Sequence, residues 1–143
     1  MPPVTQALLI SNVLVFFVVQ QLGPGIIGQF ALWPWATELF RPWQVVSYAF
    51  LHGGLTHLAF NMFGLWMFGS ELERVWGPRR MLQFYFASVL VAALAQLLVT
   101  GLLGSTAPTV GASGGLFGLL IGFAMVFPRR TITPLIPPIP MRA

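Results

Sequence analysis

The sequence contains no cysteine, no lysine and no aspartate, and only 7% of its 143 residues are charged. The absence of cysteine excludes disulfide scaffolds, thiol nucleophiles and cysteine-bound zinc. A soluble domain carries roughly 25% charged residues, whereas this chain is 57% hydrophobic and has a mean hydropathy of +0.83. A chain of this length cannot bury so much apolar surface in water, so the composition predicts an integral membrane protein.

The positive charges of the chain are seven arginines. They are scattered and form no basic patch with interleaved aromatic residues, so we expect no nucleic-acid partner. With a cytoplasmic N-terminus only Arg41 lies outside. The other six then satisfy the positive-inside tendency: Arg74, Arg79, Arg80, Arg129, Arg130 and Arg142. We therefore expect an integral multi-pass protein of a bacterial inner membrane, embedded in the lipid bilayer with its N-terminus in the cytoplasm.

Four apolar segments approach the length of about 20 residues that a helix needs to cross a bilayer. They cover the approximate ranges 7–22, 55–72, 81–103 and 113–127. The fourth is short for a span, so we expect its N-terminus to lie below the membrane surface in a hydrated recess. Between the first two, the aromatic-rich range 26–54 is expected to lie at the membrane interface as an external loop. The proline-rich range 131–143 is expected to form an extended loop.

A serine flanked by glycines stands at the start of the fourth apolar segment, in Gly111-Ala112-Ser113-Gly114-Gly115. Hydrocarbon does not favour a stray hydroxyl group, so Ser113 indicates either an N-cap or a functional site. His57 and Asn61 lie four residues apart in the second segment and share one helix face. Together a serine, an imidazole and a carboxamide suggest acyl-transfer chemistry with an oxyanion pocket. A simple polar contact between helices, worth about 0.6 kcal/mol, is an equally open interpretation of the His57–Asn61 pair.

Gly114, Gly118 and Gly122 are spaced four apart and predict a face on which another helix packs closely. The second segment offers only two glycines five residues apart, which do not match this spacing. We therefore expect the partner of this stripe to lie beyond Ala143.

Polar residues stand at both ends of the second segment. At its cytoplasmic end, Glu71, Glu73 and Arg74 are expected to cap their own helix and to pair with one another. At the other end, His52 is expected to tie the external loop to the second segment. A zinc site made of His52 and His57 is not expected. Residues five apart do not share one helix face, and no third ligand lies nearby.

Several motifs occur together in one order: Phe50-Leu51-His52-Gly53-Gly54, then His57-x-x-x-Asn61, then Glu71-x-Glu73-x-x-Trp76-Gly77, then Gly111-x-Ser113-Gly114. In this combination the chain resembles the rhomboid family of intramembrane serine proteases from about Phe40 onward. Arg41 and His52 match an arginine of the family's external loop and a further histidine. The resemblance implies an all-α polytopic membrane protein in which residues 1–143 form a rhomboid-like helical bundle. Four transmembrane helices of the six-helix core would be present.

By this resemblance Ser113 is the nucleophile, and the oxyanion hole is formed by His57, Asn61, the loop glycine Gly111 and the Ser113 backbone N–H. The family's general base is a histidine on the sixth helix, whereas the two histidines of this chain both precede Ser113. We therefore expect the fifth and sixth helices to be missing and to be partners of this chain. The 143-residue chain alone is expected to be inactive.

The resemblance implies that the full-length protein is a serine endopeptidase that cleaves transmembrane segments of membrane proteins by a Ser–His dyad. It implies no cofactor and no metal. An alternative is a non-proteolytic rhomboid-like protein that binds transmembrane clients, because the chain as given holds no general base.

Overall fold

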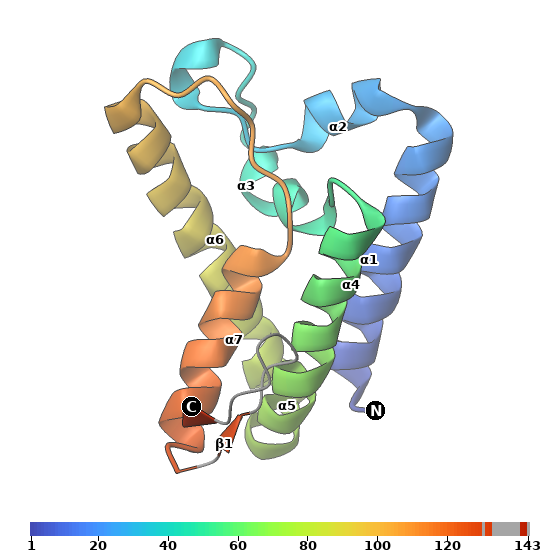
Figure 1. Cartoon of the computed structure of the whole chain (residues 1–143), viewed down its shortest axis with the longest axis vertical. Coiled ribbons are helices and arrows are strands. Elements are labelled where there is room, and N and C mark those ends of the chain that lie inside the picture. The colour runs from blue at the N-terminus through green and yellow to red at the C-terminus, as the bar shows by residue number, and fades with distance from the viewer. Residues whose placement is uncertain (130, 133–140, 143) are drawn as a thin grey trace.

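The computed structural model describes residues 1–129, 131–132 and 141–142 as an assembly of helices. Figure 1 shows α2 and α3 over one end of the bundle, whereas the N-terminus and β1 lie at the opposite end. In chain order the elements are α1 (Pro3–Leu22), α2 (Pro24–Phe30), the 3-10 helix η1 (Trp35–Thr37), α3 (Gln44–Ser47), the 3-10 helix η2 (Tyr48–Phe50), α4 (Leu55–Gly64), the π-helix η3 (Leu65–Gly69), α5 (Ser70–Trp76), α6 (Pro78–Leu103), α7 (Ser113–Val126), β1 (Thr131–Ile132) and β2 (Met141–Arg142).

Helices occupy all four of the apolar segments predicted from the sequence. Proline and glycine set several boundaries. α6 begins at Pro78, where a missing N–H costs nothing, directly after Gly77 at φ +84°. It ends at Gly104, which adopts the left-handed conformation that glycine tolerates best. Among the described residues, two helices, α1 and α6, are long and apolar enough to cross a membrane, and α7 is shorter.

Two short strands lie within the tail, which was predicted to be an extended loop. β1 pairs with β2 in an antiparallel register that joins Thr131 to Arg142 and Ile132 to Met141. The remainder of the predicted loop, residues 133–140 and 143, lies outside the described residues, as does Arg130 of the orientation argument.

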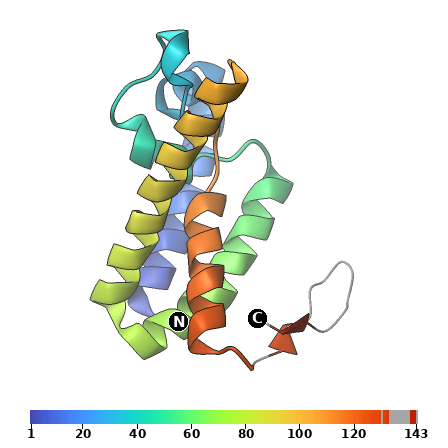
Figure 2. The ribbon, with the colours of Figure 1, turned by 90° about the vertical axis from the view of Figure 1, so that its left-hand side faces the viewer.

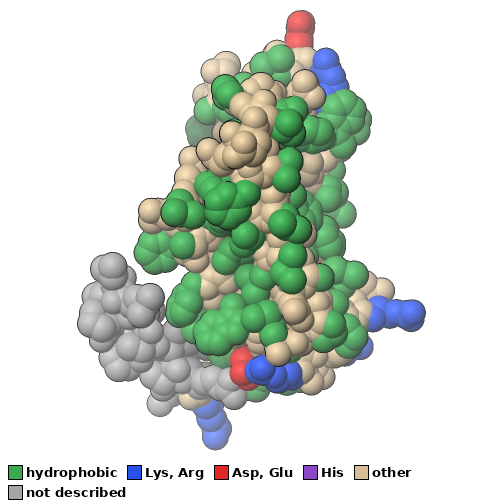
Figure 3. All heavy atoms as spheres, turned by 90° about the vertical axis from the view of Figure 1, so that its right-hand side faces the viewer, with side chains coloured by type: hydrophobic (Ala, Val, Ile, Leu, Met, Phe, Trp, Pro, Cys, Tyr) green, Lys and Arg blue, Asp and Glu red, His purple; other side chains and the backbone are tan. Residues whose placement is uncertain are grey.

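The surface of the bundle is apolar along its length. On the face shown in Figure 3, hydrophobic side chains cover the body, and the visible charged side chains lie at the two ends. Large apolar side chains on α1 and α6 are more than half exposed, among them Leu14, Phe17, Val91, Leu94 and Leu98. An apolar surface of this extent suits helices whose surroundings are lipid rather than water.

The glycine stripe of α7 packs against α6, and the two helices run side by side in Figures 1 and 2. A Cβ added at Gly114 would lie 2.6 Å from Ala92 Cβ, and one added at Gly122 would lie 2.8 Å from the Trp76 ring. A Cβ at Gly118 would overlap the Ser88 side chain. The expectation that this stripe awaits a helix beyond Ala143 is therefore wrong, because α6 and Trp76 of α5 already occupy it.

Substitution of Gly118 tests this contact. Gly118→Ala is expected to lower the stability by about 1–3 kcal/mol, as overpacking usually does. Gly101→Ala is the matched control, because no atom lies within 4 Å of a Cβ added there. Alanine raises helix propensity by about 1 kcal/mol at either position, so Gly101→Ala should be neutral or stabilising. Thermal unfolding in detergent measures both, and equal melting temperatures would contradict the close contact.

Glu73 of α5 binds the first turn of α1. Its carboxylate, only 3% exposed, accepts hydrogen bonds from Val4 N–H, Thr5 N–H and the Thr5 hydroxyl, each 2.7 Å long. Glu71 and Arg74 do pair locally, with 3.0 Å between the carboxylate and the guanidinium. The expectation that Glu73 caps its own helix is wrong, since it satisfies the free N–H groups of another helix.

Candidate active site

The serine loop, residues 105–112, connects α6 to α7 and is anchored on three sides. Thr109 and Leu32 of the external loop exchange two backbone hydrogen bonds of 2.9 Å. The side chain of Gln96 on α6 donates to Thr109 Oγ1 over 3.0 Å. The Gly111 N–H donates to the Tyr48 carbonyl over 2.9 Å. These contacts fix the path of the backbone up to the start of α7.

Gly111 brings this loop against the polar face of α4. A Cβ added to Gly111 would lie 2.8 Å from His57 Cε1 and 3.6 Å from Asn61 Nδ2. Gly111 also adopts φ +124°, which side-chain-bearing residues rarely occupy. Glycine is required here twice over, by backbone conformation and by the close approach. The structure thus brings together three residues that the sequence predicted for one site.

Ser113 is the first residue of α7, and Ala112 is the N-cap. Because Ala112 and not Ser113 occupies the N-cap position, the N-cap interpretation of this serine is wrong. Ser113 is half-buried, and within the described part of the chain its hydroxyl has no hydrogen-bond partner. Its backbone N–H belongs to the first turn of α7, where helix N–H groups are unpaired and the helix dipole is positive.

Two side-chain donors of α4 lie beside Gly111. Asn61 is 6% exposed, and its Nδ2 has no partner among the described residues, which is costly for a buried donor unless a ligand uses it. His57 is exposed, and its Nδ1 accepts a hydrogen bond of 3.5 Å from Gly53 N–H. That bond leaves the hydrogen of the neutral ring on Nε2, the nitrogen nearer Gly111.

His52 contacts both the serine loop and α4. It is 4% exposed, and its Nε2 accepts a hydrogen bond of 3.4 Å from Ala112 N–H. Its ring lies edge-on to that of His57, with 5.0 Å between centroids. Burial, with a smaller contribution from the charge of His57, lowers the pKa of His52 to about 4, although the nearby Phe50 backbone opposes this shift. The expectation that His52 ties the external loop to the second segment is therefore incomplete, because it also holds the serine loop.

Arg41 stabilises its own turn of the external loop. Its guanidinium donates to the carbonyls of Phe40 and Glu38 over 2.7 and 2.9 Å. Glu38 is the one described non-glycine residue with a positive φ, at 64°.

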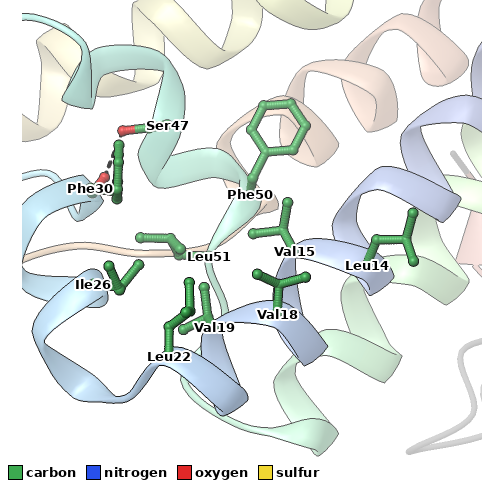
Figure 4. Close-up of a pocket in the computed structure, with 10 residues that line it drawn as sticks. All are labelled: Leu14, Val15, Val18, Val19, Leu22, Ile26, Phe30, Ser47, Phe50 and Leu51. Atoms are coloured by element: carbon green, nitrogen blue, oxygen red, sulfur yellow. Dashed lines mark hydrogen bonds between the residues drawn. The ribbon is translucent and has the colours of Figure 1, made fainter.

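An apolar pocket of about 470 Å³ lies beside this region, between the C-terminal half of α1 and the external loop (Figure 4). Leu51, directly before His52, lines the pocket and packs with Val19 and Ala31, against which Val110 of the serine loop also packs. The hydroxyl of Ser47, at the rim, donates to the Phe30 carbonyl over 2.7 Å. Sequence reasoning missed this pocket, since its residues come from three separate stretches and share no motif.

Comparison with known proteins identifies related chains. The family model described as "Rhomboid domain" matches residues 39–142. Rhomboid protease GluP of Bacillus subtilis is 37% identical over 78 residues, which are 54% of this chain and 14% of that protein. The mitochondrial Rhomboid protein 1 of Saccharomyces cerevisiae is 35% identical over 99 residues, or 68% of this chain and 29% of that protein. Rhomboid protease GlpG of Yersinia enterocolitica is 25% identical over 129 residues, or 90% of this chain and 44% of that protein.

The chain thus spans less than half the length of each of these relatives. The family match nevertheless includes α4, the serine loop and α7, which together carry every residue of the candidate oxyanion pocket. The chain belongs to the rhomboid family, whose members are integral membrane proteins.

Proposed function

We propose that this chain is part of an intramembrane serine endopeptidase in which Ser113 is the nucleophile. One observation carries the proposal: the serine loop reaches the start of α7 with Gly111 packed against His57 and Asn61. Two of the relatives described above are named as proteases, which supports the same activity. The proposed substrates are transmembrane segments of other membrane proteins.

In this mechanism the Ser113 hydroxyl attacks a peptide carbonyl, and the oxyanion binds to donors that are already in place. These donors are the Ser113 backbone N–H, His57 Nε2 and Asn61 Nδ2, with Gly111 shaping the loop around them. The positive end of α7 adds to their effect. Donors fixed before the reaction stabilise the developing charge without reorganising.

The proposed general base is a histidine on helices of the same protein beyond Ala143. It would take the proton from Ser113 Oγ and return it to the leaving amine. The bonding of both histidines in this chain supports this assignment, because His52 accepts from Ala112 N–H and His57 accepts from Gly53 N–H. The fifth and sixth core helices would then be the partners of this chain, which alone would be inactive.

We also propose that four segments cross a bacterial inner membrane, namely α1, the run α4–η3–α5, α6 and α7, with the N-terminus in the cytoplasm. The hydropathy of α1 and α6 supports two of these spans. The arginines that follow α5 and α7 support the orientation under the positive-inside tendency. In this topology Ser113 faces the extracytoplasmic side.

The oxyanion donors are tested by His57→Ala and Asn61→Ala in the protein that includes the proposed base. Each is expected to lower the turnover of a transmembrane reporter by about 10²–10³-fold, as loss of one donor does in a soluble serine protease. Thr56→Ala, an exposed change on the same helix, is the control and should leave turnover unchanged. If both variants cleave at the wild-type rate, the pair only packs helices together.

A further inference from the structure

We propose that His52 is the positioning residue that holds the Gly111–Ala112 peptide, and that it does so only as a neutral imidazole, so that acidification releases this peptide of the serine loop. The inference rests on the proposed role of Ser113, since it concerns how that serine is presented. It assigns His52 no contact with substrate.

The position of the contact in the loop supports this role. The other anchors of the serine loop to separate elements act at Thr109 and Gly111, so among the described contacts His52 makes the last hydrogen bond from outside the loop and α7 before Ser113. It joins residues 60 apart in sequence, and both Ala112 and His52 are buried, at 1% and 4% exposure. The peptide that it holds follows a glycine, which without such an anchor is free to rotate.

The chemistry of the bond makes it depend on protonation. Ala112 N–H is a donor, so His52 Nε2 must be an acceptor, and the hydrogen of the neutral ring lies on Nδ1. A second proton on Nε2 would place two donors against each other and break the hydrogen bond. The bond therefore exists only while His52 is uncharged.

The surroundings of His52 favour the uncharged state. Burial and the charge of His57 lower its pKa from 6.5 to about 4. Because the pKa of His52 in the folded protein lies below its ordinary value, neutral His52 stabilises the fold fully above about pH 6.5. This stabilisation is lost as the pH falls through about 4. The titratable groups of the neighbouring elements are His57 on α4 and Tyr48 on η2. Tyr48 directs its hydroxyl to the Val89 carbonyl and stays neutral in this range.

The test is a pH titration of the whole chain in lipid bicelles, labelled with ¹⁵N-alanine and ¹⁵N-histidine and followed by NMR. The Ala112 amide and His52 Nε2 signals are expected to move together, with one midpoint near pH 4. An Ala112 signal that ignores pH, or that moves with a midpoint different from that of His52, would overturn the inference.

Two variants separate positioning from general stability. His52→Gln supplies an amide oxygen that can accept from Ala112 N–H but does not titrate, so its Ala112 signal should be flat with pH. Gln44→Ala removes hydrogen bonds within the external loop, to Gln29 and Leu39, and should leave the Ala112 titration as in the wild type. An Ala112 signal that titrates equally in His52→Gln would also overturn the inference. If Ser113 proves unreactive at every pH, the proposed function fails while this titration still decides the role of His52.

Discussion

Ser113→Ala is expected to abolish labelling by a serine-directed fluorophosphonate in the protein that includes the proposed base histidine. Ser113 Oγ is the atom that would bond to the probe. Loss of the nucleophile costs about 10⁶-fold in kcat in a soluble serine protease, so cleavage of a transmembrane reporter should fall below detection. Gel fluorescence of the labelled protein and reporter cleavage measure the two effects.

Ser105→Ala is the matched control, because Ser105 belongs to the same loop and its hydroxyl only accepts from Ala107 N–H. It should label like the wild type. The 143-residue chain alone should label weakly or not at all, and co-expression of a fragment carrying the downstream histidine helix should restore labelling. Label that persists in Ser113→Ala would remove Ser113 as the nucleophile and would favour the client-binding alternative.

Glu73→Gln, outside the proposed active site, is expected to cause a large loss of stability. The carboxylate of Glu73 accepts three hydrogen bonds of 2.7 Å from the first turn of α1. Hydrogen bonds to a charged group are worth about 1.5–3 kcal/mol each. The amide of glutamine turns one acceptor into a donor that faces other donors, so we expect a loss of about 3 kcal/mol or more. Unfolding in a denaturing detergent titration gives the free energy.

Glu38→Gln makes the same chemical change on an exposed side chain and serves as the control. Its effect should stay within about 0.5 kcal/mol, as is usual for surface substitutions. If the two variants unfold together, the contact between α5 and α1 contributes little to the fold.

Local patterns predicted the parts of the molecule that depend on neighbours in sequence. Apolar runs bounded by glycine and proline placed the four long helical segments, since a helix forms all its backbone bonds within itself. The spacing of His57 and Asn61 placed both on one face of α4, and their contact with Gly111 agrees with that prediction.

Contacts between residues far apart in sequence were harder to predict. Glycine spacing alone does not reveal the partner of the α7 stripe, because the small residues of α6 that face it, Ser88 and Ala92, are not glycines. Nothing local indicates that Glu73 binds a turn that lies 68 or 69 residues earlier. The hydrogen bond between His52 and Ala112 joins two loops, whose paths follow no helical or strand period.

The π-helix η3 affects the directions in which side chains point at the two ends of the run α4–η3–α5. Asn61, Leu65, Gly69 and Glu73 follow His57 in steps of four, and all four are buried. In a regular α-helix each such step turns by about 40°, so that Glu73 would point about 160° away from His57. Because η3 has a wider turn, each of its residues rotates the chain by less, and the angle between His57 and Glu73 is reduced. The rotation along this run thus links the direction of the proposed oxyanion donors at one end to that of Glu73, which binds α1, at the other. A one-residue deletion within 65–69 would turn the two ends relative to each other by about 100°. The chain could then keep either the contact of α4 with Gly111 or the contact of Glu73 with α1, but not both.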